Sequence, residues 1–364
     1  MESQWNGSDA WHRDQRTISG TTMHVALADC YSPDIFTGAT LSMSKTFQEP
    51  TQLRSRIATT SLVQGLFSLA SVSFGSTIEG DAMTNSTQKM NRLREILLQM
   101  QSAVVAYSGG TDSTFLLKVV SDVLGSRVMA VTARSQTYPI GELEEANKNA
   151  KRLGVKHMII ETHELDKEEF ASNPPDRCYY CKRELYSELW EIAKEYGLNC
   201  VLDGSNSDDV HDFRPGARAG KELGVRSPLR EAELTKHDIR LLSKRMGLPT
   251  WDKPAGACLA SRLPYGCRVT PANLHRVAKA EDIIESLGIR QVRVRHHENI
   301  ARIEVPPADF RKLLTRRASD RVVREIKKLG YQYVTLDIQG YRTGSMNDPL
   351  SKSVRLRNGG HPDS

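Results

Sequence analysis

The fold is decided by the stretch Val104-Val105-Ala106-Tyr107-Ser108-Gly109-Gly110-Thr111-Asp112-Ser113-Thr114. Its first residues are apolar and β-branched, as in a buried strand, and apolar residues at helical spacing follow as far as Leu124. Gly109 and Gly110 permit turn conformations in which consecutive N–H groups point at one anion. Ser113 and Thr114 then open a helix whose positive end faces the same point. The stretch therefore predicts a strand, a phosphate-binding loop and a helix.

The type of loop follows from the residues around the glycines. A Walker loop needs Gly-Lys-Ser or Gly-Lys-Thr after its spacer, and the sequence has no such triplet. Ser108-Gly-Gly-Thr-Asp-Ser113 instead resembles the loop of the pyrophosphate-loop ATP pyrophosphatases, which split ATP between its α and β phosphates and pass AMP to a carboxylate or carbonyl oxygen. The resemblance implies a site for ATP and Mg²⁺ formed by Ser108, Gly109, Gly110, Asp112 and Ser113. The alternative is a glycine turn that only joins a strand to a helix.

Composition is that of an ordinary globular protein with room for two domains. The 364 residues are 26% charged and 39% apolar, and the net charge of +6 suits an anionic substrate such as a nucleotide without requiring nucleic acid. No apolar run reaches the ~20 residues of a membrane helix, and the nearest, Leu62–Phe74, is interrupted by serine, glutamine and glycine. We expect a cytoplasmic protein, in which six cysteines do not form a disulfide framework and a Cys-x-x-Cys binds metal or does redox work.

Strands and helices alternate after the loop. We expect strands at Val128–Thr132, Lys156–Glu161 and Asn199–Leu202, with a helix over Glu142–Leu153 between the first two. This alternation predicts an α/β fold with a doubly wound parallel sheet. Ligands of such sheets bind beyond the carboxyl ends of the strands, where the loop would lie.

The rest of the chain divides by its patterning. We expect an unstructured N-terminal extension at 1–89, an ATP pyrophosphatase domain at 90–250 that opens with a helix over Met90–Met100, a Gly/Pro/Ala-rich connector at 251–272, a small α+β domain at 273–350, and a disordered tail at 351–364. The small domain is expected to contain a helix over Asn273–Leu287, strands at Gln291–His296 and Ala301–Val305, a helix ending at Leu329, and a strand at Tyr331–Ile338.

Two further segments match the nucleotide site of the pyrophosphate-loop enzymes. Asp203-Gly204 ends a predicted strand, and Ser227-Pro228-Leu229-Arg230 precedes Lys236 at the start of a predicted helix. The resemblance implies that Asp203, Gly204 and Lys236 continue the ATP site. Each segment taken alone is also ordinary turn chemistry.

Three cysteines stand out by spacing. Cys178 and Cys181 lie just ahead of a predicted helix, and Cys258 lies in the connector. Structural zinc needs four protein ligands, which Cys267 could complete, whereas a [4Fe-4S] cluster can be held by three thiolates with one iron open to a sulfide. Independent structural cysteines are the alternative. Cys200 is predicted to be a buried core residue, and no role is predicted for Cys30 in the N-terminal extension.

A series of motifs then points to one family: Ser108-Gly-Gly-Thr-Asp-Ser113, Asp203-Gly204, Arg214-Pro215-Gly216, Cys258-Leu-Ala-Ser261-Arg262-Leu-Pro264-Tyr265-Gly266, Arg293-Val-Arg295 and Tyr333-Val-Thr-Leu-Asp337. Together they resemble the ATP-dependent sacrificial sulfur transferases of the LarE type, which act in the biosynthesis of the nickel-pincer nucleotide of lactate racemase. The likeness runs from about Met90 to Leu350 and leaves the extension outside it.

The resemblance implies a reaction in two parts. AMP is joined to a carboxylate of a pyridinium biscarboxylate mononucleotide with release of pyrophosphate, and a sulfur nucleophile then displaces AMP to give a thiocarboxylate. Some members have only the cysteine matching Cys258 and sacrifice its sulfur. Because Cys178 and Cys181 are also present, the resemblance implies a [4Fe-4S] cluster that delivers sulfide. It also implies a homo-oligomer and a downstream nickel-insertion enzyme as partner.

Other site residues are carried over from the family by position. Glu281, Glu304 and Asp309 match acidic residues around a metal or the substrate, although they could also be solvated charges. Arg293 and Arg295 share one face of a predicted strand and could bind the substrate phosphate or a neighbouring subunit, or be surface charge. Catalytic roles are expected for Cys258, Cys178, Cys181, and for Ser261 and Arg262, which position the substrate.

Rival functions remain at this point. A tRNA thiolation enzyme can pair the same loop with three cysteines, but it should show a clustered basic face with aromatics, and here the basic residues are spread. Amidating enzymes such as NAD or GMP synthetases have no use for the cysteines. A non-catalytic ATP or iron-sulfur sensor is a third possibility.

Overall fold

The computed structural model describes residues 85–211 and 213–350. Predictions about Cys30, the extension before residue 85 and the tail at 351–364 lie outside the described residues. Two sheets are present in the described part, each with its own hydrophobic core.

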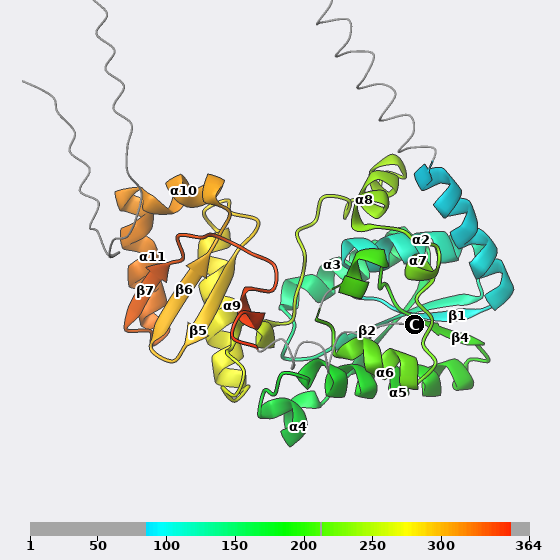
Figure 1. Ribbon diagram of the computed structural model, residues 1–364, viewed down its shortest axis with the longest axis horizontal. Coiled ribbons are helices and arrows are strands. Elements are labelled where there is room, and N and C mark those ends of the chain that lie inside the picture. Colours follow the sequence, from blue (N-terminus) through cyan, green and yellow to red (C-terminus); the bar gives the residue numbers. More distant parts are fainter. Residues whose placement is uncertain (1–84, 212, 351–364) are drawn as a thin grey trace, which may run out of the picture. The chain divides into compact units, whose positions relative to one another are not determined.

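The first sheet is parallel throughout. Its strands are β1 (Ala103–Ala106), β2 (Val128–Arg134), β3 (Lys156–Glu161) and β4 (Cys200–Leu202), in the order β3-β2-β1-β4. The predicted doubly wound parallel α/β fold is confirmed (Figure 1).

Helices cover both faces of this sheet because its strands are apolar on both sides. Ala103 and Val105 pack into one core with helices α2, α3 and α8, whereas Val104 between them packs into the opposite core with α5 and α6 (Figure 1). The helices are α2 (Thr111–Leu124), α3 (Ile140–Arg152), α5 (Arg177–Glu195), α6 (Gly216–Glu222) and α8 (Lys236–Arg245), with the short α4 (Glu168–Ala171) and α7 (Pro228–Glu231) between them.

The strand order fixes the position of the site. β2 and β4 lie on opposite sides of β1, so the chain reverses its direction of travel across the sheet next to β1. Ligands of such sheets bind at this switch point, beyond the carboxyl ends of the strands. The loop after β1 and Asp203-Gly204 after β4 therefore lie side by side, as the sequence predicts.

Two predicted boundaries are wrong. The first helix spans residues 85–100, so residues 85–89 belong to it and not to an unstructured extension. Its apolar residues Met90, Leu93, Leu97 and Met100 enter the core on the α2 face. Cys178 and Cys181 lie within the first turns of α5 instead of ahead of it, because the helix begins at Arg177.

The second sheet is small and mixed. β5 (Arg293–His297) pairs antiparallel with β6 (Ile300–Glu304), and β6 pairs parallel with β7 (Tyr333–Leu336). Helices α9 (Pro271–Glu285), α10 (Phe310–Leu314) and α11 (Arg316–Lys328) contribute to its core. The predicted small α+β architecture is confirmed, with a last strand shorter than expected. In the described part of the chain no helix is both long and apolar enough to cross a membrane.

Candidate active site

The loop after β1 has the geometry of an anion site. Gly109 has φ +70°, and a Cβ there would lie 2.8 Å from the Cβ of Ala146 on α3, so glycine is required for conformation and for space. Gly110 caps α2 without a side-chain hydrogen bond, which leaves the first N–H groups of the helix to a ligand. The hydroxyls of Ser108 and Ser113 lie 3.0 Å apart across the turn.

Asp112 in the first turn of α2 is held by two neighbours. Its Oδ2 accepts a hydrogen bond from Lys236 Nζ and another from Asn206 Nδ2 at 3.3 Å, whereas its Oδ1 is buried and has no partner among the described residues. A buried carboxylate oxygen without a partner is costly, and oxygen is the ligand that Mg²⁺ prefers. Asp112 therefore suits a bound metal ion.

Asp203 and Gly204 have different tasks. The Asp203 carboxylate accepts hydrogen bonds from Tyr186 at 2.9 Å and from Ser227 at 2.7 Å, so it ties β4 to its surroundings. A Cβ on Gly204 would lie 3.2 Å from Ser113 N, so the absence of a side chain lets the loop after β4 approach the loop after β1. Gly204 thereby permits the two loops to pack closely against each other.

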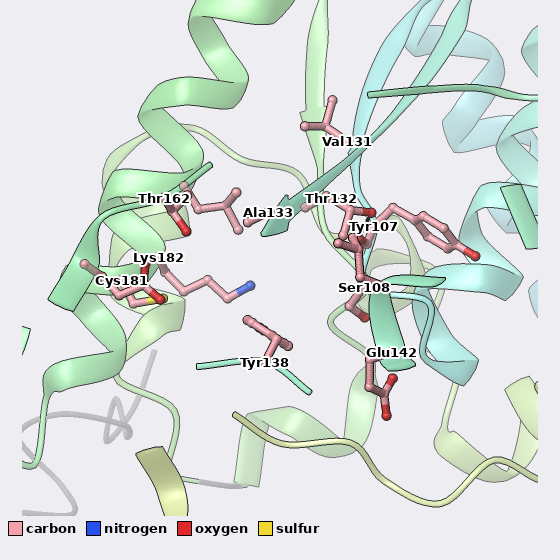
Figure 2. A pocket seen from close by; sticks show the side chains of 14 residues that line it. Tyr107, Ser108, Val131, Thr132, Ala133, Tyr138, Glu142, Thr162, Cys181 and Lys182 are labelled. Carbon is pink, nitrogen blue, oxygen red and sulfur yellow. Dashed lines mark hydrogen bonds between the residues drawn. The ribbon is translucent and has the colours of Figure 1, made fainter. Parts of the chain in front are cut away.

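A cavity lies between the phosphate loop and Cys181. Ser108 and Tyr107 line one side of it, and Cys181 and Lys182 of α5 line the other. Figure 2 shows Lys182 Nζ pointing into the cavity, with Tyr138 below it. The floor is formed by the ends of β1 and β2, so a nucleotide on the loop would extend toward α5.

Cys181 and Cys258 pack against one hydrophobic cluster, and Cys178 lies one turn before Cys181 in α5. Burial raises the pKa of the Cys181 thiol, and the nearby Glu164, Cys258 and Cys178 raise it further. The ammonium of Lys182 lowers the pKa but does not outweigh these effects. Burial also raises the pKa of Cys258, opposed by the charge of Arg177. Each thiol is thus close enough to influence the charge of the others.

Thr137, in the loop after β2, supports Cys258 and is itself bonded to Glu164, which follows β3. Thr137 forms a side-chain hydrogen bond with the Cys258 thiol, which lowers the pKa of that cysteine, and Thr137 O accepts a hydrogen bond from Leu259 N at 2.8 Å. Thr137 Oγ1 is also 3.0 Å from Oε1 of the buried Glu164, whose Oε2 has no partner in the described part of the chain. Thr137 therefore links the connector to the β2 end of the cavity.

The connector around Cys258 is fixed by Arg262. Its Nη1 donates to Ala257 O at 2.7 Å and to Cys258 O at 3.1 Å, and its Nε and Nη2 bind both carboxylate oxygens of Glu281 at 2.9 and 2.8 Å. Both side chains are buried, and Glu281 also accepts a hydrogen bond from Val294 N. Arg262 thus holds the Cys258 backbone against α9.

Arg293 and Arg295 hold the connector on either side of that point. Arg293 Nη2 donates to Ala255 O, and Arg295 Nη1 donates to Ser261 O at 3.2 Å. Both arginines are buried, and burial next to Arg262 lowers the pKa of Arg293 to about 10. The interpretation of these two arginines as surface charge is wrong.

The acidic residues are engaged in ion pairs. Glu304 is fully buried and binds Arg295 at 2.7 Å and Arg302 at 3.2 Å, and Asp309 binds Lys312 at 2.8 Å. Within residues 85–211 and 213–350, no group of three or more His, Cys, Asp or Glu side chains has an arrangement that could hold a metal ion. Glu281, Glu304 and Asp309 therefore do not form a joint metal site, and Cys178, Cys181 and Cys258 are likewise not arranged as metal ligands in this structure. The alternative of solvated charges is wrong for Glu281 and Glu304.

Comparison with known proteins bears on the predicted family. An uncharacterized protein of Synechocystis is 43% identical over 264 residues, which are 72% of this chain and 98% of that protein. Pyridinium-3,5-bisthiocarboxylic acid mononucleotide synthase of Lactiplantibacillus plantarum is 42% identical over 272 residues, 74% of this chain and 98% of that protein. The chain belongs to this synthase family. The LarE resemblance is thereby confirmed, although no family model matches the chain.

Some more distant relatives match only about half of this chain. A GMP synthase of Aeropyrum pernix is 30% identical over 203 residues, half of this chain and 39% of that enzyme. Partial matches of this kind agree with a nucleotide-binding domain that the synthase family shares with other enzymes.

Several side chains of this synthase site were missed by the sequence analysis. Tyr138, Glu164 and Lys182 line the cavity, Thr137 contacts Cys258, and Lys253 contacts the phosphate loop. A signal existed only for Lys182, which directly follows Cys181. The others are common residue types with distant partners. Cys267, the fourth ligand considered for zinc, packs against the same hydrophobic cluster as Cys181 and Cys258, and burial and then Glu298 raise the pKa of its thiol.

Proposed function

We propose that the chain is an ATP-dependent sulfurtransferase that converts a carboxylate of a pyridinium mononucleotide into a thiocarboxylate. The observation that carries the proposal is the cavity lined by both Ser108 of the phosphate loop and Cys181. A relative named pyridinium-3,5-bisthiocarboxylic acid mononucleotide synthase supports the same substrate class. The products would serve nickel-pincer nucleotide biosynthesis, with a nickel-insertion enzyme acting downstream.

In the first step a substrate carboxylate oxygen attacks the α phosphorus of ATP. The bond between the α phosphorus and the bridging oxygen breaks, and pyrophosphate leaves with the electron pair. The N–H groups after Gly110 and the Lys236 ammonium would stabilise the charge on the phosphates, and Asp112 Oδ1 would bind Mg²⁺. This step makes a poor electrophile reactive.

In the second step a hydrosulfide-level sulfur attacks the activated acyl carbon. A C–S bond forms, the C–O bond to AMP breaks, and the proton of the sulfur nucleophile passes to solvent or to a base. Arg262, Arg293 and Arg295 would act by holding the connector so that Cys258 stays at the cavity. Ser261 would be held in place by the same contacts.

We also propose that Cys178, Cys181 and Cys258 hold a [4Fe-4S] cluster. The support for this proposal is the sequence spacing of the three cysteines, since a [4Fe-4S] cluster can be held by three thiolates whereas zinc needs a fourth protein ligand; in the described residues the three thiols themselves do not have an arrangement that could hold a metal ion. When bound, the cluster would supply a sulfide on its fourth iron and allow many turnovers. Arg177, buried beside these thiols, would offset part of their negative charge.

The activity is tested by product analysis. We expect AMP and pyrophosphate to appear only when ATP and the pyridinium biscarboxylate mononucleotide are both present. Product formation with tRNA instead would favour the tRNA thiolation alternative, amide formation with ammonia would favour a synthetase, and ATP binding without any turnover would favour a sensor.

The cluster is tested by anaerobic purification with an iron count and an absorption spectrum. We expect Cys178→Ala to lose iron and multiple turnover together, whereas Cys267→Ala, the matched control, keeps both. A Cys178→Ala protein without a cluster but with undiminished multiple turnover would end the delivery hypothesis. Conversion of Cys258 to dehydroalanine in single-turnover wild-type protein, seen by mass spectrometry, would favour sacrifice of its sulfur.

A further inference from the structure

Lys253 is a largely buried lysine that reaches the phosphate loop from the connector. Its side chain is 13% exposed, and its Nζ lies 3.4 Å from Gly109 O, 2.8 Å from Glu142 Oε2 and 2.6 Å from Glu145 Oε2. An ammonium is therefore held at the rim of the loop.

The surroundings keep Lys253 at this place. Glu142, Glu145 and Ala146 share one face of α3, and Ala146 lies against Gly109, so the two carboxylates stand directly beside the loop. The connector backbone is tied to the same region, because Thr111 Oγ1 donates to Thr250 O at 2.8 Å and Arg240 Nη2 donates to Lys253 O at 2.8 Å. The lysine backbone is fixed, and its side chain retains a flexible four-carbon stem.

Lys253 is held as a charged ammonium by two carboxylates. Burial alone would lower its pKa, but hydrogen bonds to Glu142 and Glu145 outweigh that effect and raise the pKa, so the side chain stays an ammonium. A lysine with three donors and a compact charge can exchange carboxylate oxygens for phosphate oxygens at little cost in geometry. A phosphate chain on the loop would carry more charge than either carboxylate.

We propose that Lys253 is a phosphate-binding residue of the ATP site, whose ammonium turns from Glu142 and Glu145 to the β and γ phosphates when ATP binds. The inference rests on the proposed ATP-dependent function and adds a second ammonium to that of Lys236. Lys253 precedes Cys258 by only five residues, so phosphate binding and the position of the thiol are linked through one short segment.

The experiment compares two ligands by calorimetry on the full chain with Mg²⁺ and without pyridinium substrate. ATP carries the β and γ phosphates and AMP lacks them. We expect Lys253→Met to weaken ATP binding about 10- to 100-fold, as for loss of a charge-assisted hydrogen bond, and to leave AMP binding within about 2-fold. Lys253→Arg, which keeps the charge, should recover part of the ATP affinity.

Glu145→Gln separates this role from a purely structural one. If Lys253 binds phosphate, removing a competing carboxylate tightens ATP binding. If Lys253 only ties the connector to α3, then Glu145→Gln and Lys253→Met weaken ATP and AMP alike, and the inference is overturned. Equal ATP affinity in wild type and Lys253→Met would also overturn it, whereas wild-type protein that binds no ATP would refute the proposed function itself.

Discussion

Gly109 determines how closely α3 can approach the phosphate loop. It combines φ +70° with a site where a Cβ would lie 2.8 Å from Ala146 Cβ. Gly154, at the end of α3, has φ +67° but open space around the position of a Cβ. Both positions therefore need glycine for its positive φ, but only Gly109 also needs it for lack of space.

We expect Gly154→Ala to lose about 1–2 kcal/mol of unfolding free energy, because alanine is disfavoured at positive φ, and Gly109→Ala to lose more, because its methyl group must also displace Ala146. Only Gly109→Ala should also lose ATP affinity, since its methyl group pushes α3 and the loop apart. Urea unfolding and ATP calorimetry measure the two effects. An equal loss of ATP affinity in Gly154→Ala would show that global strain, and not the local contact, is responsible.

At the scale of single residues, the sequence predicts site residues that belong to a local motif. It misses those whose role depends on contacts with distant segments. The sequence identifies the loop glycines, Asp112 and Ser113, because they belong to one short contiguous motif. Glu164 and Lys253 are common surface residue types, and their importance arises only when Cys258 and the loop meet them. No local pattern carries that information.

At the scale of elements, side chains of α9 and β5 hold the connector in place. The alternation in Arg293-Val-Arg295 correctly predicts that both arginines share a face, but it gives no partner, and the structure supplies backbone carbonyls of Ala255 and Ser261. A helix pattern likewise places Glu281 without indicating that it faces Arg262. The segment carrying Cys258 is thus held by elements that follow it in the chain.

The Arg262–Glu281 pair offers a test with a neighbour as control. Glu281→Gln leaves the buried guanidinium of Arg262 without its charge partner and should cost about 3–5 kcal/mol of unfolding free energy. Asp282→Asn on the same helix breaks an exposed pair with Lys279 and should cost about 0–1 kcal/mol. Urea unfolding compares them, and equal losses would contradict the importance of the buried pair.

Asp238 joins the helix at 85–100 to α8. Although burial alone would raise its pKa, hydrogen bonds from Lys89, Ser86 and Thr235 outweigh that effect and hold the pKa well below its usual value. A carboxylate with a lowered folded-state pKa stabilises the fold above its unfolded pKa, near 3.9, and this contribution is lost as pH falls toward the folded value.

We therefore expect wild-type stability to decline between about pH 4 and about pH 2, and Asp238→Asn to decline less over that window because it has no proton to gain. The variant should already be less stable at neutral pH, since it loses the capping box of α8. Urea unfolding at several pH values measures both. Parallel pH dependence in the two proteins would exclude Asp238 as a source of acid sensitivity.

At the scale of the whole molecule, the alternation of strands and helices was sufficient to predict the fold class and the edge of the sheet that carries the site. The relatives match over 264 and 272 residues, which are 98% of their own chains but 72% and 74% of this one. The start of the first helix was misplaced, since its first turn has few apolar residues and is fixed by polar contacts to a segment about 150 positions later, at separations of 152 and 149 residues.

Those long-range contacts predict where the folded unit must begin. A chain beginning at Met83 keeps Ser86 and Lys89, whereas a chain beginning at Met90 keeps the apolar stripe of the helix but loses both donors to Asp238. We expect the first to bind ATP as the full chain does, and the second to lose about 1–3 kcal/mol of unfolding free energy, because Asp238 keeps only Thr235 among its described donors and its Oδ1 loses the hydrogen bond from Ser86. Thermal unfolding and ATP calorimetry on both chains test this. Failure of the Met83 chain to fold or to bind ATP would mean that the preceding residues are part of the functional unit, and equal stability of the two chains would mean that Asp238 is satisfied by other groups.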